Sequence, residues 1–237
     1  MNAIILCGGL STRLKDITKS IPKVLLEIKG KTVLDWQLEK IKELGLNEVI
    51  LAAGHLSGVL KNTVGEERNG VKLIYAIEKE RLGTGGAIKF ALSHLQNPHL
   101  PTFVLNGDIL TGVNLREMLV KLNPDKEGIL MGAKVEDASS YGTLVFNKSN
   151  ELLEFKEKEG KNISGYINGG IYLFTRKAHQ HFPEEKDNFS VEYDVFPKMK
   201  ELDVYTFDGD WIDIGVPERL EWARQNWNDQ TPMFNDQ

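Results

Sequence analysis

The first 110 residues alternate between short apolar runs and segments with helical spacing, and this alternation constrains the fold more than any other feature. The apolar runs predict buried strands at residues 3–7, 48–54, 71–77 and 102–108. Between them, residues 33–44 carry apolar side chains at helical spacing and end before Gly45, and residues 84–96 predict a second helix. Strands that alternate with helices favour a parallel sheet with helices on both faces.

After about residue 128 the pattern changes, because strands follow one another with short connections. Strands are expected in the segments ILMGAKV, GTLVFN, ELLEF and YINGGIYLF, with a helix at 190–200 and a closing helix at 216–228. The two parts together predict an α/β three-layer fold with a mixed, mostly parallel central sheet. We expect a single domain over residues 1–237.

Composition limits the partners and the compartment. The net charge of −5 implies no basic face, so we expect no nucleic-acid partner. The start MNAIILCGG has no basic segment and only a five-residue apolar run, so we expect neither a signal peptide nor a membrane span. Cys7 is the only cysteine, which excludes an intramolecular disulfide and favours a cytoplasmic protein.

A glycine loop follows the first strand directly, in the stretch IILCGGLSTRLKDITKSIPK. Loops at the carboxyl ends of parallel strands commonly bind ligands, and Gly8 and Gly9 let backbone N–H groups approach a phosphate closely. Arg13 adds a bidentate phosphate donor, and Lys23 adds a point charge. The patterns G-x-G-x-x-G and G-x-x-x-x-G-K-[ST] are both absent, so neither the dinucleotide fingerprint nor the P-loop applies. An ordinary glycine turn with surface cations is the alternative.

The opening loop and five later segments resemble, in order, the motifs of the sugar-1-phosphate nucleotidylyltransferases. That family's first motif runs G-G-x-G-T-R-L, then P-K and G-K, and this chain has GGLSTRLKDITKSIPKVLLEIKGK. The later matches are EKERLGTGGAI (78–88), LNGD (105–108), FKEKEG (155–160), INGGIYLF (167–174) and WIDIG (211–215). The resemblance covers nearly the whole chain and implies a Rossmann-like three-layer sandwich. It also implies a nucleotide-binding half at 1–112 and a sugar-phosphate-binding half at 113–237.

The resemblance implies that a sugar-1-phosphate oxygen attacks the α-phosphorus of a nucleoside triphosphate and displaces pyrophosphate. Because the nucleophile is already an anion, catalysis requires alignment and charge neutralisation rather than a protein base. The implied catalytic cations are Arg13 on the triphosphate, Lys23 near the α-phosphate and Lys158 on the sugar phosphate. The implied nucleotide-binding residues are Leu6, Gly8, Gly9, Ser11, Thr12, Arg13, Glu78, Gly83 and Thr84. The implied sugar-binding residues are Asn106, Gly142, Glu157, Lys158 and Asn168.

One position departs from the family pattern. Ser11 stands where G-G-x-G-T-R-L has its last glycine. A side chain is less favourable than glycine where the backbone needs a positive φ, so the geometry of this loop is expected to differ. Its phosphate-binding groups are all kept.

Carboxylates that end apolar segments indicate a metal site. Asp108 follows the apolar run FVLNG, and Asp213 lies within WIDIG. Mg²⁺ prefers a few protein oxygens together with substrate phosphates, so two such carboxylates suit it. We therefore predict Mg²⁺ as the cofactor, held by Asp108 and Asp213. For Asp108 taken alone, a turn or helix-cap aspartate is the alternative.

Glu78 bears on the choice of base. A carboxylate only accepts hydrogen bonds, and guanine offers N1–H and an exocyclic NH₂ side by side. Uracil and thymine offer one N–H between two carbonyls, which a carboxylate would repel. GTP is therefore favoured, and the resemblance implies a heptose- or mannose-type sugar 1-phosphate. A uridylyltransferase acting on N-acetylmuramate- or hexose-1-phosphate stays open, as does a solvated surface charge at Glu78.

Two other functional classes fit this sequence less well. A catalytically silent regulatory paralogue that binds nucleotide sugars is expected to lack a phosphate-binding cation or a metal carboxylate, but this chain keeps them all. A glycosyltransferase that consumes a nucleotide sugar is expected to lack the opening signature. The expected partners are thus the small-molecule substrates, an NTP and a sugar 1-phosphate. Dimers or larger assemblies are common for such folds, and a homodimer is the assembly expected here.

Overall fold

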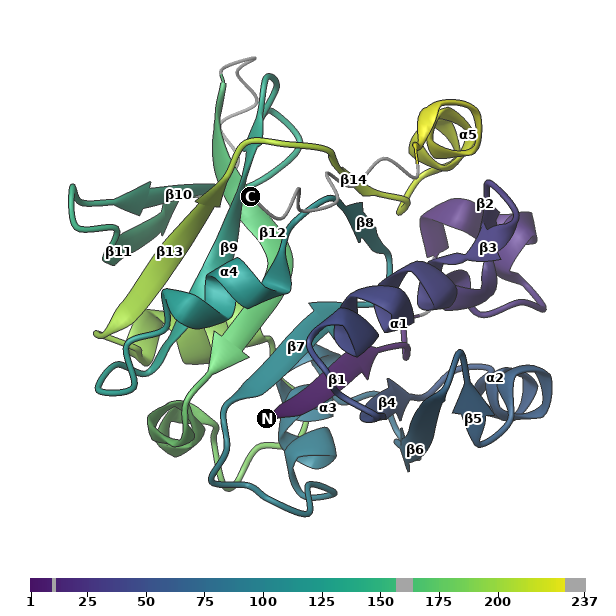
Figure 1. The fold of residues 1–237 in the computed structure, drawn as a ribbon, viewed down its shortest axis with the longest axis horizontal. Helices are drawn as coiled ribbons and strands as arrows, with labels where there is room; N and C mark the ends of the chain where they lie inside the picture. Colours follow the sequence, from purple (N-terminus) through teal and green to yellow (C-terminus); the bar gives the residue numbers. More distant parts are fainter. Residues whose placement is uncertain (10–11, 157–163, 229–237) are drawn as a thin grey trace.

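The computed structural model describes residues 1–9, 12–156 and 164–228, and it contains a large mixed sheet with helices on both faces (Figure 1). Within the described residues, ten strands form this sheet in the order β11-β10-β12-β7-β1-β4-β6-β5, with β9 beside β12 and β13 beside β9. The expected α/β three-layer fold with a mixed central sheet is confirmed.

The first half of the chain supplies the parallel part of the sheet. These strands are Asn2–Leu6 (β1), Glu48–Ala53 (β4), Val71–Ile77 (β6) and Thr102–Asn106 (β7). β1 pairs in parallel with both β4 and β7, and β6 pairs in parallel with β4. The short strand Glu67–Arg68 (β5) closes this edge in the antiparallel sense. Most residues of β1, β4 and β7 are buried, as expected for strands covered on both faces.

The second half of the chain extends the sheet mainly with antiparallel strands. The long strand Gly165–Phe174 (β12) pairs antiparallel with β7 on one side and with Gly128–Val135 (β9) on the other. Leu202–Phe207 (β13) runs parallel to β9, and Thr143–Phe146 (β10) and Leu152–Lys156 (β11) form a hairpin. The expected change of pattern near residue 128 is therefore confirmed.

Helices cover the two faces with separate apolar cores. The helices Val33–Glu43 (α1), Ser57–Val64 (α2) and Leu115–Val120 (α4) bury side chains in one core. The helix Gly83–Leu92 (α3) buries Ile88 and Ala91 in the core of the opposite face. α1 begins at a capping box in which the Thr32 hydroxyl accepts from the Asp35 N–H and the Asp35 carboxylate accepts from the Thr32 N–H. This box fixes where α1 starts.

The prediction of a helix at 190–200 is wrong, because this segment does not form a regular α-helix. The structure has a π-helical turn at Val191–Val195 (η4), then a 3₁₀ turn at Phe196–Lys198 (η5). Pro197 lies in the first turn of the second segment, where its missing N–H cannot continue the hydrogen bonds of the first. The expected closing helix is confirmed, with bounds Pro217–Asn226 (α5).

Two small sheets lie beside the main one. Ile109–Thr111 (β8) pairs antiparallel with Trp211–Asp213 (β14), and Glu27–Ile28 (β2) pairs antiparallel with Lys31–Thr32 (β3). Figure 1 shows β8 and β14 between the end of β7 and α5. Because β8 follows β7 after a two-residue turn, the β8–β14 pair brings the two predicted metal segments together. None of the helices in the described parts of the chain is long and apolar enough to cross a membrane.

Candidate active site

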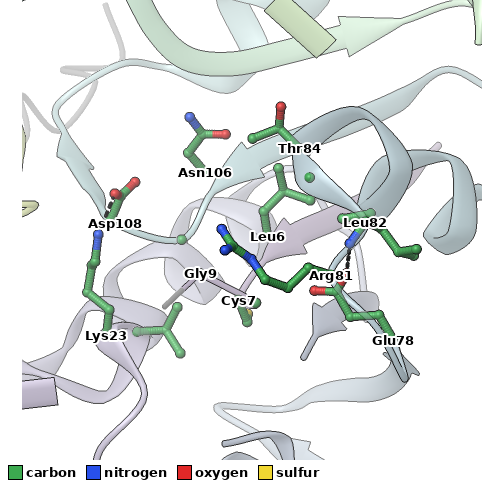
Figure 2. Close-up of a pocket in the computed structure, with 15 residues that line it drawn as sticks. Leu6, Cys7, Gly9, Lys23, Glu78, Arg81, Leu82, Thr84, Asn106 and Asp108 are labelled. Atoms are coloured by element: carbon green, nitrogen blue, oxygen red, sulfur yellow. Dashed lines mark hydrogen bonds and ion pairs between the residues drawn. The ribbon is translucent and has the colours of Figure 1, made fainter. Parts of the chain in front are cut away.

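A cavity of about 260 Å³ opens at the carboxyl ends of β1 and β7 (Figure 2). Its walls come from the loop after β1, the start of α3 and the turn after β7. The carboxyl ends of parallel strands are where open α/β sheets bind ligands. The predicted site residues that line this cavity are Leu6, Gly8, Gly9, Lys23, Glu78, Gly83, Thr84, Asn106 and Asp108.

A second cavity of about 570 Å³ adjoins the first, because Asn106 and Asp108 line both. Its other walls include the predicted sugar-binding residues Gly142 and Asn168 and the predicted metal ligand Asp213. Asn106 and Asp108 thus stand between a cavity lined by the glycine loop and a cavity lined by the second half of the chain. This arrangement suits a reaction that joins two bound molecules at one point.

Glu78 forms part of the wall of the first cavity. Its carboxylate accepts a hydrogen bond of 3.0 Å from the backbone N–H of Leu82, which Figure 2 marks. A Cβ atom on Gly8 or Gly54 would overlap the Glu78 carboxylate, so these two glycines make room for it. Burial raises the pKa of Glu78, while the Leu82 N–H and the Arg81 charge act to lower it. Glu78 is therefore a half-buried acceptor facing the cavity.

The turn after β7 packs directly on β1. The Gly107 N–H donates to the Leu6 carbonyl at 3.0 Å, and a Cβ atom at Gly107 would overlap that oxygen. The turn presents Asp108 to Lys23, whose Nζ lies 2.8 Å from Oδ2 of Asp108 (Figure 2). Lys23 begins a short 3₁₀ turn, Lys23–Leu25 (η2), directly after Pro22. A cation and a carboxylate from distant parts of the sequence therefore meet at the junction of the two cavities.

Asp213 is held by three donors. Its Oδ1 accepts from Nη2 of Arg219 at 2.7 Å and from the Gly215 N–H at 2.9 Å, and its Oδ2 accepts from the Tyr141 hydroxyl at 2.7 Å. Burial and the hydrogen bond to Asp213 raise the pKa of Tyr141 well above its ordinary value, so this hydroxyl stays a donor. Asp213 is therefore a carboxylate whose orientation is fixed by its neighbours.

The donor set at the junction fits a divalent cation. In register, Asp213 of β14 lies opposite Ile109 of β8, and the Ile214 N–H donates to the Asp108 carbonyl at 2.9 Å. The two carboxylates therefore belong to neighbouring segments that face one cavity. The described residues contain no group of three or more His, Cys, Asp or Glu that could cage a metal. Two carboxylates beside a substrate cavity match a cation that takes its other oxygens from phosphates and water.

The predicted sugar-binding side chains are tied to β12. Asn168 donates through Nδ2 to the Tyr172 hydroxyl at 3.0 Å and accepts from the Gly170 N–H through Oδ1 at 3.0 Å. Oδ1 of Asn106 is buried and has no hydrogen-bond partner among the described residues. An unpaired buried acceptor beside a cavity is a natural point of contact for a ligand hydroxyl.

Residues 2–230 match the sequence profile of a protein family described as Nucleotidyl transferase. The chain belongs to this family. A D-glycero-alpha-D-manno-heptose 1-phosphate guanylyltransferase from Campylobacter jejuni is 41% identical over 220 residues, which cover 92% of this chain and 96% of that protein. The mannose-1-phosphate guanylyltransferase catalytic subunit beta from Drosophila melanogaster is 35% identical over 222 residues, which cover 91% of this chain but 60% of that longer subunit.

Solved structures agree with this assignment. HddC from Yersinia pseudotuberculosis, complexed with GMP-PN, superposes with a TM-score of 0.82 at 31% identity, covering 96% of this chain and 99% of that chain. A putative glucose-1-phosphate thymidylyltransferase from Bacillus anthracis, at 22% identity and a TM-score of 0.84, shares the fold. The resemblance to sugar-1-phosphate nucleotidylyltransferases is confirmed, and the Rossmann-like architecture with it.

Some predicted residues of this nucleotidyl transferase lie elsewhere or outside the described residues. Ser11, Glu157 and Lys158 belong to segments that the structure does not describe. Thr12 begins the turn Thr12–Thr18 (η1), is exposed, and lines neither cavity. Arg13 lines the second cavity rather than the first, with its guanidinium beside Gly215.

Thr84, predicted to bind nucleotide, is engaged within the protein. Its hydroxyl donates to Oε2 of Glu192 at 2.7 Å and accepts from the Val191 N–H at 3.0 Å. These bonds tie the start of α3 to η4. Thr84 therefore lines the first cavity, but its hydroxyl already has two hydrogen-bond partners within the protein.

Sequence reasoning missed three side chains at this site. Arg81 lines the first cavity, and Figure 2 shows it reaching toward Cys7 and Gly9. Tyr141 and Arg219 hold Asp213. Arg81 was hidden in the charged stretch EKER, which is typical of a solvated loop, and neither Tyr141 nor Arg219 carried a separate motif signal. The only sequence signal for Tyr141 was its position next to Gly142, a predicted sugar-binding residue.

Proposed function

We propose that this nucleotidyl transferase transfers GMP from GTP to a heptose- or mannose-type sugar 1-phosphate, with release of pyrophosphate. The observation that carries the proposal is the meeting of two cavities at Asn106 and Asp108. The relatives named above act on heptose 1-phosphate and mannose 1-phosphate, and both are named guanylyltransferases. Residues 1–112 would form the nucleotide-binding half of one domain, and residues 113–237 the sugar-phosphate-binding half.

The choice of guanine rests on donors and acceptors in the first cavity. The Glu78 carboxylate would accept from N1–H and the exocyclic NH₂ of guanine, two donors that lie side by side. Arg81 lines the same cavity and would donate to O6 or N7, the acceptors of guanine that arginine commonly contacts. Uracil offers the carboxylate one N–H between two carbonyls, so UTP with N-acetylmuramate- or hexose-1-phosphate is the less favoured alternative.

The residues at the junction would bring two anions together and neutralise them. The sugar-phosphate oxygen attacks the α-phosphorus. The bond between the α-phosphorus and the oxygen that bridges it to the β-phosphorus breaks, and pyrophosphate leaves with the electron pair of that bond. No proton has to move, because the nucleophile is already ionised. We propose that Lys23 neutralises the α-phosphate and Lys158 the sugar phosphate. Arg13, which lines the second cavity, would reach the triphosphate from that side of the junction. Gly8 and Gly9 would offer backbone N–H groups to the triphosphate.

The divalent cation is proposed to be Mg²⁺. Asp108 and Asp213 would hold it, and when bound it would offset the negative charge of the phosphates. Asp108 would exchange its ion pair with Lys23 for the cation, which frees the Lys23 ammonium for phosphate. Tyr141 and Arg219 would keep Asp213 oriented meanwhile.

Pyrophosphate release from the purified protein tests the proposal. GTP, UTP, CTP, dTTP and ATP would each be combined with mannose-, glucose-, heptose- and N-acetylmuramate-1-phosphate in the presence of Mg²⁺. Release with GTP and a manno-configured sugar is expected, and release with UTP alone would overturn the base assignment. No release with any pair would favour a regulatory paralogue. The cytoplasmic location and the homodimer remain predictions, the latter testable by light scattering on the purified protein.

A further inference from the structure

A buried glutamine on α1, Gln37, forms hydrogen bonds to the turn that carries Asp108. Nε2 of Gln37 donates to the carbonyl of Asn106 at 2.8 Å and to the carbonyl of Ile109 at 3.1 Å. These two carbonyls flank Gly107 and Asp108, so both hydrogens of one amide group hold the two ends of one turn. The residue is 3% exposed, so water does not compete for these bonds.

The same turn also fixes where Asp213 lies. Ile109, whose carbonyl Gln37 binds, is the register partner of Asp213 across the β8–β14 pair. Directly after Asp213, the Ile214 N–H donates to the Asp108 carbonyl at 2.9 Å. The position of the Asn106–Ile109 backbone therefore bears on where both carboxylates lie.

The other end of the Gln37 amide suggests why a glutamine stands here. Oε1 of Gln37 is buried and has no hydrogen-bond partner among the described residues. A buried carbonyl without a partner lowers stability, and a methionine of similar shape would avoid that loss. What distinguishes this glutamine from a methionine is therefore its pair of N–H donors.

We propose that Gln37 is a positioning residue of the metal site, which sets the distance between the Asp108 and Asp213 carboxylates through the main chain. The proposal rests on the cation-binding role proposed for these two aspartates. Gln37 lines neither the first nor the second cavity, so it touches no substrate in either of them. It acts from behind the turn, through the carbonyls of Asn106 and Ile109. Residues that orient metal ligands in this way commonly contribute 10–100-fold in metal affinity.

The test compares Gln37→Met with a matched variant on the same helix. Gln37→Met keeps the shape and removes both donors. Asp35→Asn is the control, because Asp35 is also buried on α1 but binds Arg68 and Thr32, away from the turn. Binding of Mn²⁺ alone would be followed by electron paramagnetic resonance, with Asp108→Ala defining the site. The Mg²⁺ concentration for half-maximal turnover and the thermal unfolding midpoint would be measured on the same preparations.

Gln37→Met is expected to weaken Mn²⁺ binding and raise the half-saturating Mg²⁺ by about tenfold or more. Asp35→Asn should lower the unfolding midpoint and leave both metal readouts unchanged. If Gln37→Met alters only the unfolding midpoint, as Asp35→Asn does, the positioning role is overturned. If Gln37→Met does not fold, Gln37→Asn, whose amide is one methylene too short to bridge both carbonyls, replaces it under the same criteria. Wild-type Mn²⁺ binding that survives in Asp108→Ala would instead refute the metal site itself.

Discussion

Nζ of Lys23 lies 2.8 Å from Oδ2 of Asp108, so a proposed phosphate-binding cation and a proposed metal ligand form an ion pair. Their side chains are 15% and 31% exposed, which places the pair at the edge of the cavity where substrates can compete for both partners. A carboxylate paired in this way gives up little when a divalent cation replaces the ammonium group. The ion pair therefore positions both groups where the two cavities meet.

Lys23→Met is expected to lower turnover about 100-fold or more, the loss typical of removing one group that stabilises developing charge. The same change should tighten Mn²⁺ binding, because Asp108 loses its competing cation. Turnover and Mn²⁺ affinity would be measured together. Lys23→Arg, which keeps the charge, is the control and should lose less turnover. A Lys23→Met enzyme with wild-type turnover would remove Lys23 from the reaction.

Asp108→Ala is expected to abolish turnover and leave the fold intact. The partly exposed pair with Lys23 adds little to stability, about 1 kcal/mol or less, so the unfolding midpoint should shift by only a few degrees. Pyrophosphate release and thermal unfolding check both parts. Asp208→Ala is a matched control, because this exposed aspartate pairs with Lys134 outside both cavities and should keep full turnover. Wild-type-like turnover in Asp108→Ala would refute the metal assignment.

Glu78→Gln is expected to lower kcat/KM for GTP by about 10–100-fold, the contribution of a charged hydrogen bond. The reason is that the glutamine amide offers one acceptor where guanine presents two donors. Burial raises the pKa of Glu78, so in the wild type kcat/KM for GTP should fall on acidification at a higher pH than an ordinary glutamate would give. The variant should lack this acidic limb.

The stability of the same variant gives an independent check. A carboxyl whose pKa is raised by folding stabilises the protein most below its ordinary pKa, and this contribution is lost as the pH rises through the folded-state value. At neutral pH the charged Glu78 therefore costs stability. Glu78→Gln should raise the thermal unfolding midpoint at pH 7 and not at pH 4. A lowered midpoint at pH 7 would contradict the raised pKa.

The parallel half of the fold could be predicted because its strands are buried on both faces and alternate with helices. Strands such as Glu48–Ala53 appear in the sequence as uninterrupted apolar runs, and their predicted bounds are right to within two residues. The position of β12 between β7 and β9 could not be predicted in this way, since its pairing is antiparallel and joins residues about 30 to 70 positions apart. The π-helical turn at Val191–Val195 depends on tertiary contacts such as that of Thr84 with Glu192.

Some residues of the candidate site could likewise be predicted from the sequence, and others could not. Asp108 and Asp213 were predicted as a pair because each ends an apolar segment, and the β8–β14 pairing explains how they meet. Gln37 could not be predicted, because its role consists of two bonds to main-chain carbonyls that no sequence pattern encodes. Arg219 was missed for a related reason, since its hydrogen bonds to Asp213 and its contact with the Tyr141 ring belong to no sequence motif.

Gly107→Ala is expected to lower turnover about tenfold or more while leaving nucleotide affinity nearly unchanged. The new Cβ atom would overlap the Leu6 carbonyl and contact Val24, so the turn would have to move away from β1 and carry Asp108 with it. Steady-state kinetics with GTP, together with GTP binding by calorimetry, separate the two effects. Gly112→Ala is the control, since the nearest atom to its Cβ would be 3.8 Å away. Full turnover in Gly107→Ala would show that the turn tolerates displacement.

Asp35→Asn is expected to lower the free energy of unfolding at pH 7 by about 2 kcal/mol. Although burial acts to raise it, hydrogen bonds from Arg68 and Thr32 lower the pKa of Asp35 from 3.8 to about 2. A carboxylate with a lowered pKa stabilises the fold above its ordinary pKa, and this contribution is lost as the pH falls through the folded-state value. Chemical denaturation at pH 7, 5 and 3 should therefore show a difference between wild type and variant that is constant down to about pH 5 and roughly halved near pH 3. Arg68→Met should show the same pH dependence, because it removes the other half of the pair. A difference that does not change between pH 7 and pH 3 would mean that Asp35 stabilises α1 as a neutral cap rather than as an ion pair.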